Sequence, residues 1–277
     1  MSERLQVLHY NVGRQKHVQW SMLSDKAYAQ FAALAVVEPY LYADQRTGEV
    51  RCGSHGSWQP FTPSLQREHS HTQFAYRAML WVNTVCQAVQ VPVLSHDIVA
   101  VSIATSAGTA LVISAYDPNN GDNQTENRQI LEQKLALIRR AIDEACSRVG
   151  GEVEIVLCSD FNRHHCLWGG SDRIVTRRRN EGVPLVHFAQ EYGLQSMLPA
   201  GTITWQHVGM ERYSSIDVIM ASARLAAQLI RCSVHEHDHG SDHQPIVIEF
   251  NFAAKQGSRS RVAFSQKGRT GRRSGRR

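Results

Sequence analysis

Short runs of apolar residues recur along most of the chain and predict a structure rich in β-strands. Some runs alternate apolar and polar residues, as in "RLQVLHYN", and others are continuous, as in "EIVLC". Both patterns are typical of strands that pack against a core. The predicted strands are 4–11, 32–38, 73–83, 88–93, 97–103, 109–116, 152–160, 201–205, 214–221, 230–236 and 244–250, and the Gly-, Ser- and Pro-rich residues 39–71 are predicted to form a long loop.

Helical spacing of apolar residues is clearest over 127–149, where Leu131, Leu135 and Ile138 fall on one face. Helices are also predicted at 17–31, at 181–194 with Gly193 closing the helix, and in short form at 221–229. Strands follow one another too often without a helix between them for a doubly wound parallel sheet. We therefore predict an α/β fold in which two mixed β-sheets pack face to face with helices outside.

The stretch from Ile98 to Tyr116 carries no charge, which raises the alternative of a membrane span. It contains several Ser and Thr residues and the small cluster "TSAGT" at its centre. We therefore predict a hairpin of two buried strands here and no membrane partner.

Charge is distributed unevenly along the 277 residues. Of the 30 Lys and Arg residues, nine lie between Ala253 and Arg277, where there are no acids. The first 252 residues therefore hold 21 basic against 25 acidic residues. We predict one domain over 1–252 and a basic disordered tail over 253–277 that binds DNA or another polyanion. A nuclear-import signal and the remnant of a linker are the alternatives for the tail.

The six cysteines form no C-x-x-C pair, and Cys158 lies in an apolar strand where a free thiol packs as a small hydrophobe. The first residues, "MSERLQVLHYNV", place charges before a short apolar run, unlike a secretory signal. We expect an intracellular, reducing location, nuclear or nucleocytoplasmic.

Acids and amides recur where the predicted strands end. Such side chains meet in one pocket if the strand ends lie at the same edge of the sheets. Carboxylate and amide oxygens are ligands that suit Mg²⁺ or Mn²⁺, and a carboxylate can also activate a water. The residues in question are Asn11, Glu38, Tyr116, Asn119, Asp160, Asn162, Asp217, Asp242 and His243.

The segment "HEHDHGSDHQPIVIEF" allows two interpretations. His235, His237 and His239 could form a zinc site, but no cysteine is placed to complete it, and we expect them to be exposed loop residues. A His that directly follows an Asp, as in Asp242-His243, suits a site where a buried acid orients the imidazole and keeps it protonated.

Six motifs in order resemble the endonuclease/exonuclease/phosphatase superfamily, the DNase I-like group. They are "LHYNVGR", "VVEP", "ISAYDPNN", "CSDFNRHHCLWGG", "SSIDVIMAS" and "GSDHQPI". The extended "DFN-x-HH-x-LWGG" together with "GTITW" is most similar to the AP endonuclease-like domain of non-LTR, LINE-type retrotransposons. The resemblance covers residues 5 to 251 and implies a four-layer α/β sandwich.

The resemblance implies a DNA-nicking phosphodiesterase that depends on Mg²⁺ or Mn²⁺ and leaves a 3′-hydroxyl. The metal ligands would be Glu38, Asn11 and Asp242, and the catalytic residues Asp160, Asn162, His243, Asp217 and Tyr116, with Asn119, His165 and Arg177 contacting the substrate. A reverse transcriptase domain or retroelement RNA would be a partner in a parent element. The sequence lacks an Asp-Asp dipeptide, so we expect a separate domain, a truncated element or a domesticated copy.

Several alternatives remain open from sequence. AP endonuclease-like enzymes often carry an acid at the position of Gly13, so a second acidic metal ligand is in doubt. A repair AP endonuclease or a phosphatase would share the same motifs, and an inactive nucleic-acid-binding module would need few of them. Individually, Tyr116 could be a packing residue and Asp160 part of an Asx turn.

Overall fold

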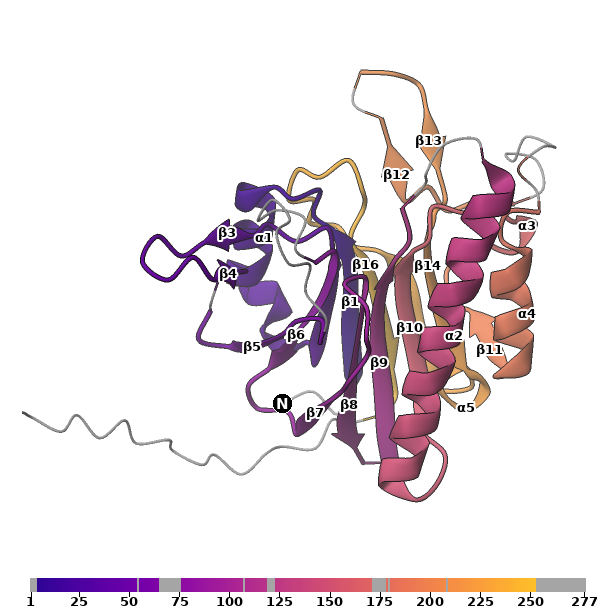
Figure 1. Cartoon of the computed structure of the whole chain (residues 1–277), viewed down its shortest axis with the longest axis horizontal. Coiled ribbons are helices and arrows are strands. Elements are labelled where there is room, and N and C mark those ends of the chain that lie inside the picture. The colour runs from indigo at the N-terminus through magenta and orange to yellow at the C-terminus, as the bar shows by residue number, and fades with distance from the viewer. Residues whose placement is uncertain are drawn as a thin grey trace, which may run out of the picture.

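Two six-stranded sheets form the body of the protein (Figure 1). The structure is a computed structural model that describes residues 4–252 except 54, 65–75, 107, 119–122, 171–177, 179 and 208. The predicted tail over 253–277 lies outside the described residues, as do Asn119 and Arg177.

The first sheet has the strand order β15-β16-β1-β2-β6-β5. Only β1 and β2 run parallel, and the other neighbours are antiparallel. The bounds are β1 Leu5–Asn11, β2 Ala33–Val37, β5 Trp58–Phe61, β6 Ala78–Asn83, β15 Leu229–Val234 and β16 Ile246–Phe250.

The second sheet has the order β11-β14-β10-β9-β8-β7, with β9 and β10 as its parallel pair. Its strands are β7 Ala88–Val91, β8 Ile98–Thr105, β9 Gly108–Tyr116, β10 Glu154–Asp160, β11 Leu194–Ser196 and β14 Asp217–Ser222. The charge-free stretch is therefore the antiparallel pair β8 and β9, as predicted. No helix in the described part of the chain has the length and apolar character needed to cross a membrane.

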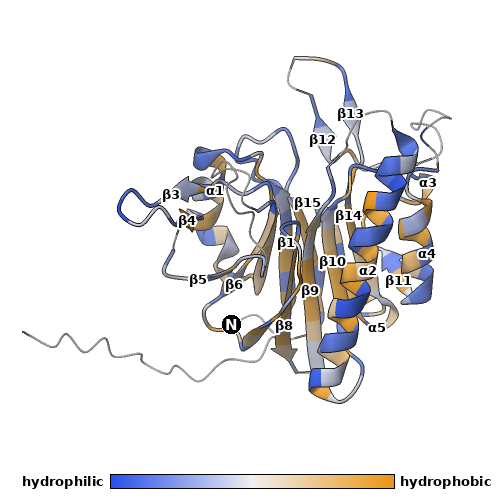
Figure 2. Ribbon diagram, viewed as in Figure 1, coloured by the Kyte–Doolittle hydropathy of each residue, from blue (hydrophilic) through white to orange (hydrophobic). Residues whose placement is uncertain are grey.

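The longer helices lie on the outer faces of the two sheets. The bounds are α1 Lys16–Ser24, η1 Lys26–Gln30, α2 Gln124–Val149, α3 Cys166–Gly169, α4 Val183–Glu191 and α5 Ala223–Ala226. Helices α2 and α4 pack against the second sheet, while α1 and η1 pack against the first. Figure 2 shows hydrophilic and hydrophobic residues alternating along α2, in front of largely apolar strands.

A continuous apolar layer fills the space between the sheets. Leu5, Val7 and Ile248 of the first sheet pack in one buried cluster with Val112 and Ile219 of the second. Each side chain of this type contributes roughly 1.5–3 kcal/mol when it is fully buried. The face-to-face packing of two mixed sheets with helices outside confirms the predicted four-layer architecture.

Two local predictions were wrong. The segment 17–31 is not one helix, because Asp25 adopts an extended conformation between α1 and η1 and accepts a hydrogen bond from the Ala27 amide. The predicted loop 39–71 contains β5 and a small sheet of β3 Tyr42–Ala43 with β4 Val50–Arg51. Strand β5 is short, contains Pro60 and lies at a sheet edge, so pairing with β6 rather than local pattern defines it.

Candidate active site

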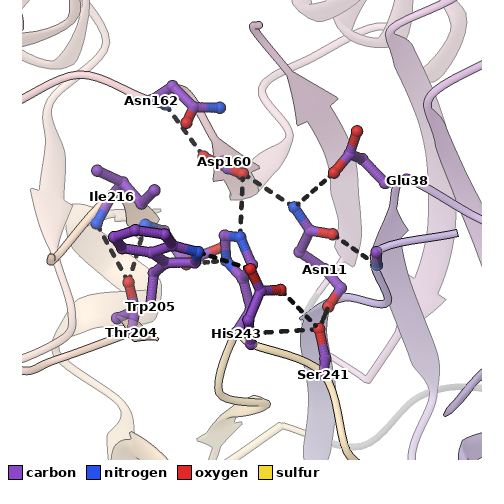
Figure 3. A network of polar contacts seen from close by, with 12 residues as sticks. Asn11, Glu38, Asp160, Asn162, Thr204, Trp205, Ile216, Ser241 and His243 are labelled. Carbon is purple, nitrogen blue, oxygen red and sulfur yellow. Dashed lines mark hydrogen bonds and ion pairs between the residues drawn. The ribbon is translucent and has the colours of Figure 1, made fainter. Parts of the chain in front are cut away.

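The polar strand ends meet at one end of the two sheets, as predicted. In the second sheet, Asp160 at the end of β10 is paired in register with Tyr116 on one side and Asp217 on the other. In the first sheet, Asn11 ends β1 and Glu38 directly follows the neighbouring strand β2. Figure 3 shows the resulting network, to which both sheets contribute.

Asn11 joins the two sheets at this site. Its Nδ2 atom donates to Asp160 Oδ2 at 3.0 Å and lies 3.4 Å from Glu38 Oε2. Its Oδ1 atom accepts a hydrogen bond from the Gly13 amide at 2.9 Å. Asn11 therefore turns its nitrogen, not its oxygen, toward the carboxylates, and the structure presents it as the donor that links Glu38 to Asp160.

Asp217 holds His243 next to Asp160. His243 Nδ1 donates to Asp217 Oδ2 at 2.8 Å, and its Nε2 atom lies 3.9 Å from Asp160 Oδ2. The second oxygen of Asp217 lies 3.1 Å from Nε2 of His9, a buried residue that the sequence analysis did not select. Asp160, Asp217 and His243 are all buried, so their mutual contacts replace water.

The turn before His243 is tied to β1 and to a hairpin. Ser241 Oγ donates to the Asn11 carbonyl at 2.7 Å, and Asp242 Oδ2 accepts from Trp205 Nε1 at 2.8 Å. Trp205 belongs to the hairpin of β12 Trp205–Gln206 and β13 Tyr213–Ser214, which projects beyond the sheets in Figure 1. Neighbouring Thr204 accepts from the Asp217 amide through its hydroxyl, which fixes the start of β14.

Backbone strain is concentrated at this site. Three non-glycine residues in the described part of the chain have positive φ: Arg14 at 58°, Glu38 at 47° and Asn162 at 51°. Each such conformation costs on the order of 1–3 kcal/mol and persists only where surrounding contacts impose it. Glu38 is held by hydrogen bonds from its amide to the Arg77 carbonyl and from the Arg14 amide to its own carbonyl. Strain of this kind is typical of functional sites.

Burial and neighbouring charges set the pKa values of the central groups. Burial and the Asp217 charge raise the pKa of Asp160, although His243 opposes them. Burial raises the pKa of Asp217, but His243 and His9 outweigh it and hold that pKa well below the usual range. Burial lowers the pKa of His243, yet Asp217 and Asp160 raise it to about 9. Burial also raises the pKa of Tyr116, beside Glu38, so Tyr116 keeps its proton.

The His243–Asp217 pair is expected to make stability fall as pH rises. The pKa of His243 is about 9 in the folded state and about 6.5 when unfolded, so protonation stabilises the fold fully below about pH 6.5. This contribution, on the order of 3 kcal/mol, is lost as pH rises through about 9. Urea unfolding in EDTA should show the wild-type advantage over His243→Gln shrinking across this range. A constant advantage would contradict the pairing.

A second network of buried charges lies behind the site, and sequence analysis missed it. Lys134 Nζ donates to Asp97 Oδ2 at 2.5 Å and to the Tyr116 carbonyl at 2.8 Å. Arg163 Nη2 donates to Asp117 Oδ2 at 2.6 Å, and the Asp117 carbonyl accepts from Asn162 Nδ2 at 3.1 Å. The network therefore holds the backbone of Tyr116 and the side chain of Asn162 in place. The available signal was a charged residue on the apolar face of an amphipathic helix, since Lys134 shares the buried face of α2 with Leu131 and Ile138.

Replacing Lys134 by methionine is expected to lower the free energy of unfolding by about 3 kcal/mol, because it leaves two buried carboxylates with less compensation. Loss of one partner from a buried ion pair usually costs about 3–5 kcal/mol. The low end of this range applies because Asp97 still pairs with Arg77, and Asp117 still pairs with Arg163. Urea denaturation measures this change. Lys16→Met, at an exposed position, is the matched control, and a loss similar to that control would show that the network is not stabilising.

The side chains of His164 and His165 stabilise the loop that follows β10. His165 Nδ1 accepts from the Leu167 amide at the start of α3, and its ring packs on Trp168. His164 contacts Glu181 at 3.2 Å through Nδ1 and Ser214 at 3.2 Å through Nε2. The predicted substrate contact by His165 stays a prediction, since its described contacts are those that close this loop.

The histidine-rich segment differs from expectation. His237 is exposed, but the His239 side chain is only 5% exposed and shares a 2.9 Å hydrogen bond with the Tyr28 hydroxyl. His237 Nδ1 lies 3.0 Å from Asp25 Oδ2. Within the described ranges, Asp160, Asp217 and His243 are the one group of three or more His, Cys, Asp or Glu residues whose ligand atoms all lie within 4.8 Å of one another. The histidines therefore attach the turn that precedes His243 to η1 and to its capping residue Asp25.

The ligand set fits a hard divalent cation at Glu38. Glu38 pairs with the Arg14 guanidinium, which shows that this corner of the site favours positive charge. Asp242 lies against the turn that follows Asn11, since a Cβ built on Gly13 would be 3.9 Å from its Oδ1 atom. Gly13 itself has φ of +56°, a conformation that an acid at this position would find strained. Asp217 is engaged by two imidazoles and is a poor candidate for a ligand.

Comparisons with known proteins agree with this geometry. Residues 110–247 match the family model described as Endonuclease-reverse transcriptase. The fold is similar to the endonuclease domain of TRAS1, a telomere-specific non-LTR retrotransposon, with 20% identity, a TM-score of 0.66 and coverage of 89% of this chain and 98% of that one. No curated protein matches the sequence.

Two further solved structures are also similar in fold. The catalytic domain of Xenopus laevis APE2 has 10% identity and a TM-score of 0.68, with 91% of this chain and 94% of that one covered. AP endonuclease LMAP from Leishmania major has 11% identity and a TM-score of 0.66, with 90% and 88% covered. The fold and the family match together relate the chain to hydrolases of the endonuclease and exonuclease type. The chain belongs to the endonuclease/exonuclease/phosphatase superfamily, the DNase I-like group.

Proposed function

We propose that this protein is a divalent-metal-dependent DNA endonuclease that nicks one strand and leaves a 3′-hydroxyl, as in retrotransposon endonucleases. The observation that carries the proposal is the buried Asp217–His243 pair, placed 3.9 Å from Asp160 in a site where Glu38 offers a carboxylate to a cation. A module that only binds nucleic acid has no use for buried, strained and mutually charged residues of this kind.

Asp160 is the residue we assign to the attacking water. Its raised pKa makes it a stronger base than an ordinary carboxylate, and Asn11 and the Asn162 amide hold its two oxygens in place. Proton transfer to a positioned base of this kind typically contributes about 10²–10⁴ in rate. We assign Asn162, whose amide contacts Asp160, to a contact with a phosphate oxygen through its side chain.

His243 and Tyr116 are assigned to the phosphate. Protonated His243, held by Asp217, faces the site with Nε2 and stabilises the negative charge that develops on phosphorus-bound oxygens. Tyr116 keeps its proton and donates a hydrogen bond. We also assign Asn119 and Arg177, outside the described residues, and His165 to contacts with DNA.

Glu38 is assigned as the principal metal ligand, with Asp242 beside it and Asn11 orienting the carboxylates. A Mg²⁺ or Mn²⁺ ion bound there would supply charge neutralisation for the phosphate and its leaving oxygen.

Supercoiled plasmid is the substrate that tests the proposed function. We expect open-circular product with Mg²⁺ or Mn²⁺ and none with EDTA, and we expect DNA polymerase to extend the nick because its end is a 3′-hydroxyl. A parallel arm with an abasic duplex separates repair AP endonuclease activity, which the similarity to AP endonuclease LMAP suggests, from nicking of intact DNA. If the protein binds DNA without a metal and gives no nicked product, it is a nucleic-acid-binding module and not a nuclease.

The wider context is part of the same proposal. The family description and the TRAS1 domain both point to retroelements. We therefore propose a reverse transcriptase or retroelement RNA as a partner in a parent element, a nuclear place of action, and a tail over 253–277 that binds DNA.

A further inference from the structure

His9 is a buried polar residue inside the apolar layer between the sheets. It lies on β1, paired with Ala35 on one side and Ile246 on the other, and its exposed fraction is 0%. Leu5 and Val7, the preceding alternate residues of the strand, pack in the apolar inter-sheet cluster. His9 instead reaches the opposite sheet, where its Nε2 atom lies 3.1 Å from Asp217 Oδ1.

The Asp217 carboxylate is thereby shared between two imidazoles, one on each oxygen. His9 binds Oδ1 and His243 binds Oδ2, and these are its side-chain hydrogen bonds within the described residues. A carboxylate held at one oxygen alone can rotate about its Cβ–Cγ bond, whereas one held at both cannot. Its orientation sets the direction of His243 Nε2 toward Asp160.

We propose that His9 is a positioning residue that acts on the phosphodiesterase reaction through Asp217 and His243. The inference rests on the proposed function and deepens it. His9 Nδ1 has no hydrogen-bond partner among the described residues, so the ring carries its proton on Nε2 and donates it to Asp217. The orientation of the third group determines how well a paired histidine works in catalysis, as in hydrolases with a histidine and acid pair.

A purely structural role would be a hydrogen bond that joins the two sheets. Two amide variants separate the roles, because the glutamine Nε2 atom occupies the reach of histidine Nε2 and the asparagine amide is one bond shorter. We expect His9→Asn and the isosteric apolar His9→Leu to lower kcat by about 10–100-fold. His9→Gln should restore kcat to within about threefold of wild type, with KM for DNA little changed in all three.

The matched control is Val7→Ala, on the same strand and face but without a polar contact. It should lower thermal stability by creating a cavity while kcat stays at the wild-type value. If His9→Leu does not fold, the amide pair decides: equal kcat for the Gln and Asn variants would overturn the proposal. A folded His9→Leu with wild-type kcat would overturn it as well.

A double-mutant cycle shows whether His9 acts through Asp217. In an Asp217→Asn background, adding His9→Leu should change the remaining kcat by less than about threefold, because coupled residues are not additive. A loss as large as in the wild-type background would place the action of His9 elsewhere and overturn the inference.

One measurement does not depend on activity and separates this inference from the proposed function. Histidine ¹⁵N spectra of the wild-type protein should show His9 as the Nε2–H tautomer. The His243 Nδ1–H signal should weaken in His9→Leu and persist in His9→Gln. An unchanged signal in His9→Leu overturns the positioning role, whereas a wild-type protein that fails to nick DNA with Mg²⁺ overturns the proposed function alone.

Discussion

Asp160→Asn is expected to lower the nicking rate at saturating DNA by about 10²–10⁴, because the amide keeps the hydrogen-bonding shape but cannot accept the proton of the attacking water. His243→Gln is expected to lose a similar amount, since it removes the positive charge that faces the phosphate. Single-turnover nicking of supercoiled plasmid measures both. The double variant should be little slower than either single one, because the two residues act as a unit.

Matched controls separate this loss from damage to the fold. Asp143→Asn on α2 and His187→Gln on α4 make the same substitutions at exposed positions and should nick at the wild-type rate. The assignment of Asp160 and His243 is wrong if either site variant, folded by circular dichroism, keeps a rate near that of wild type.

Glu38→Gln is expected to shift the metal requirement of the enzyme. An amide keeps the shape of the carboxylate but not its charge, on which Mg²⁺ binding depends strongly. Half-maximal nicking should need at least about tenfold more Mg²⁺, since the affinity of such a site depends on the number of charged ligands. Activity should partly return at high Mg²⁺ or with Mn²⁺, while DNA binding in EDTA stays close to that of wild type.

Thermal stabilisation by the ion gives a second measure of the same change. A ligand that binds only the folded state raises the melting temperature with concentration. Mn²⁺ should stabilise the wild type more than Glu38→Gln. Glu152→Gln, an exposed acid at the opposite end of β10, is the control and should behave as wild type. Equal metal requirements in wild type and Glu38→Gln would remove Glu38 from the ligand set.

The fold class was predictable because the alternation of apolar and polar residues that marks a buried strand spans only a few neighbouring positions. Alternating and continuous apolar runs located most strands of both sheets, including β8 and β9. Their close succession excluded a doubly wound sheet. The prediction failed at β5, and at the break between α1 and η1. There a partner strand or a single capping carboxylate decides the outcome, and neither leaves a periodic pattern.

The position of polar residues at strand ends predicted most of the site residues for a related reason. A polar residue at the end of an apolar strand faces the edge of the sheet, and the motifs placed Asn11, Glu38, Asp160 and His243 there. What each side chain does at that edge depends on register. The pairing of Asp160 with both Tyr116 and Asp217, and the turned amide of Asn11, are properties of the assembled sheets.

By itself, the sequence determined the kinds of strand and helix, the two-sheet class and the residues with chemistry to offer, because these depend on neighbours a few positions away. Only the tertiary structure decided which groups meet. His9 and Asp217 are separated by 208 positions, and Lys134 and Asp97 by 37. Contacts of such range carry no local pattern, since they arise when the two sheets pack and their registers set which side chains face one another.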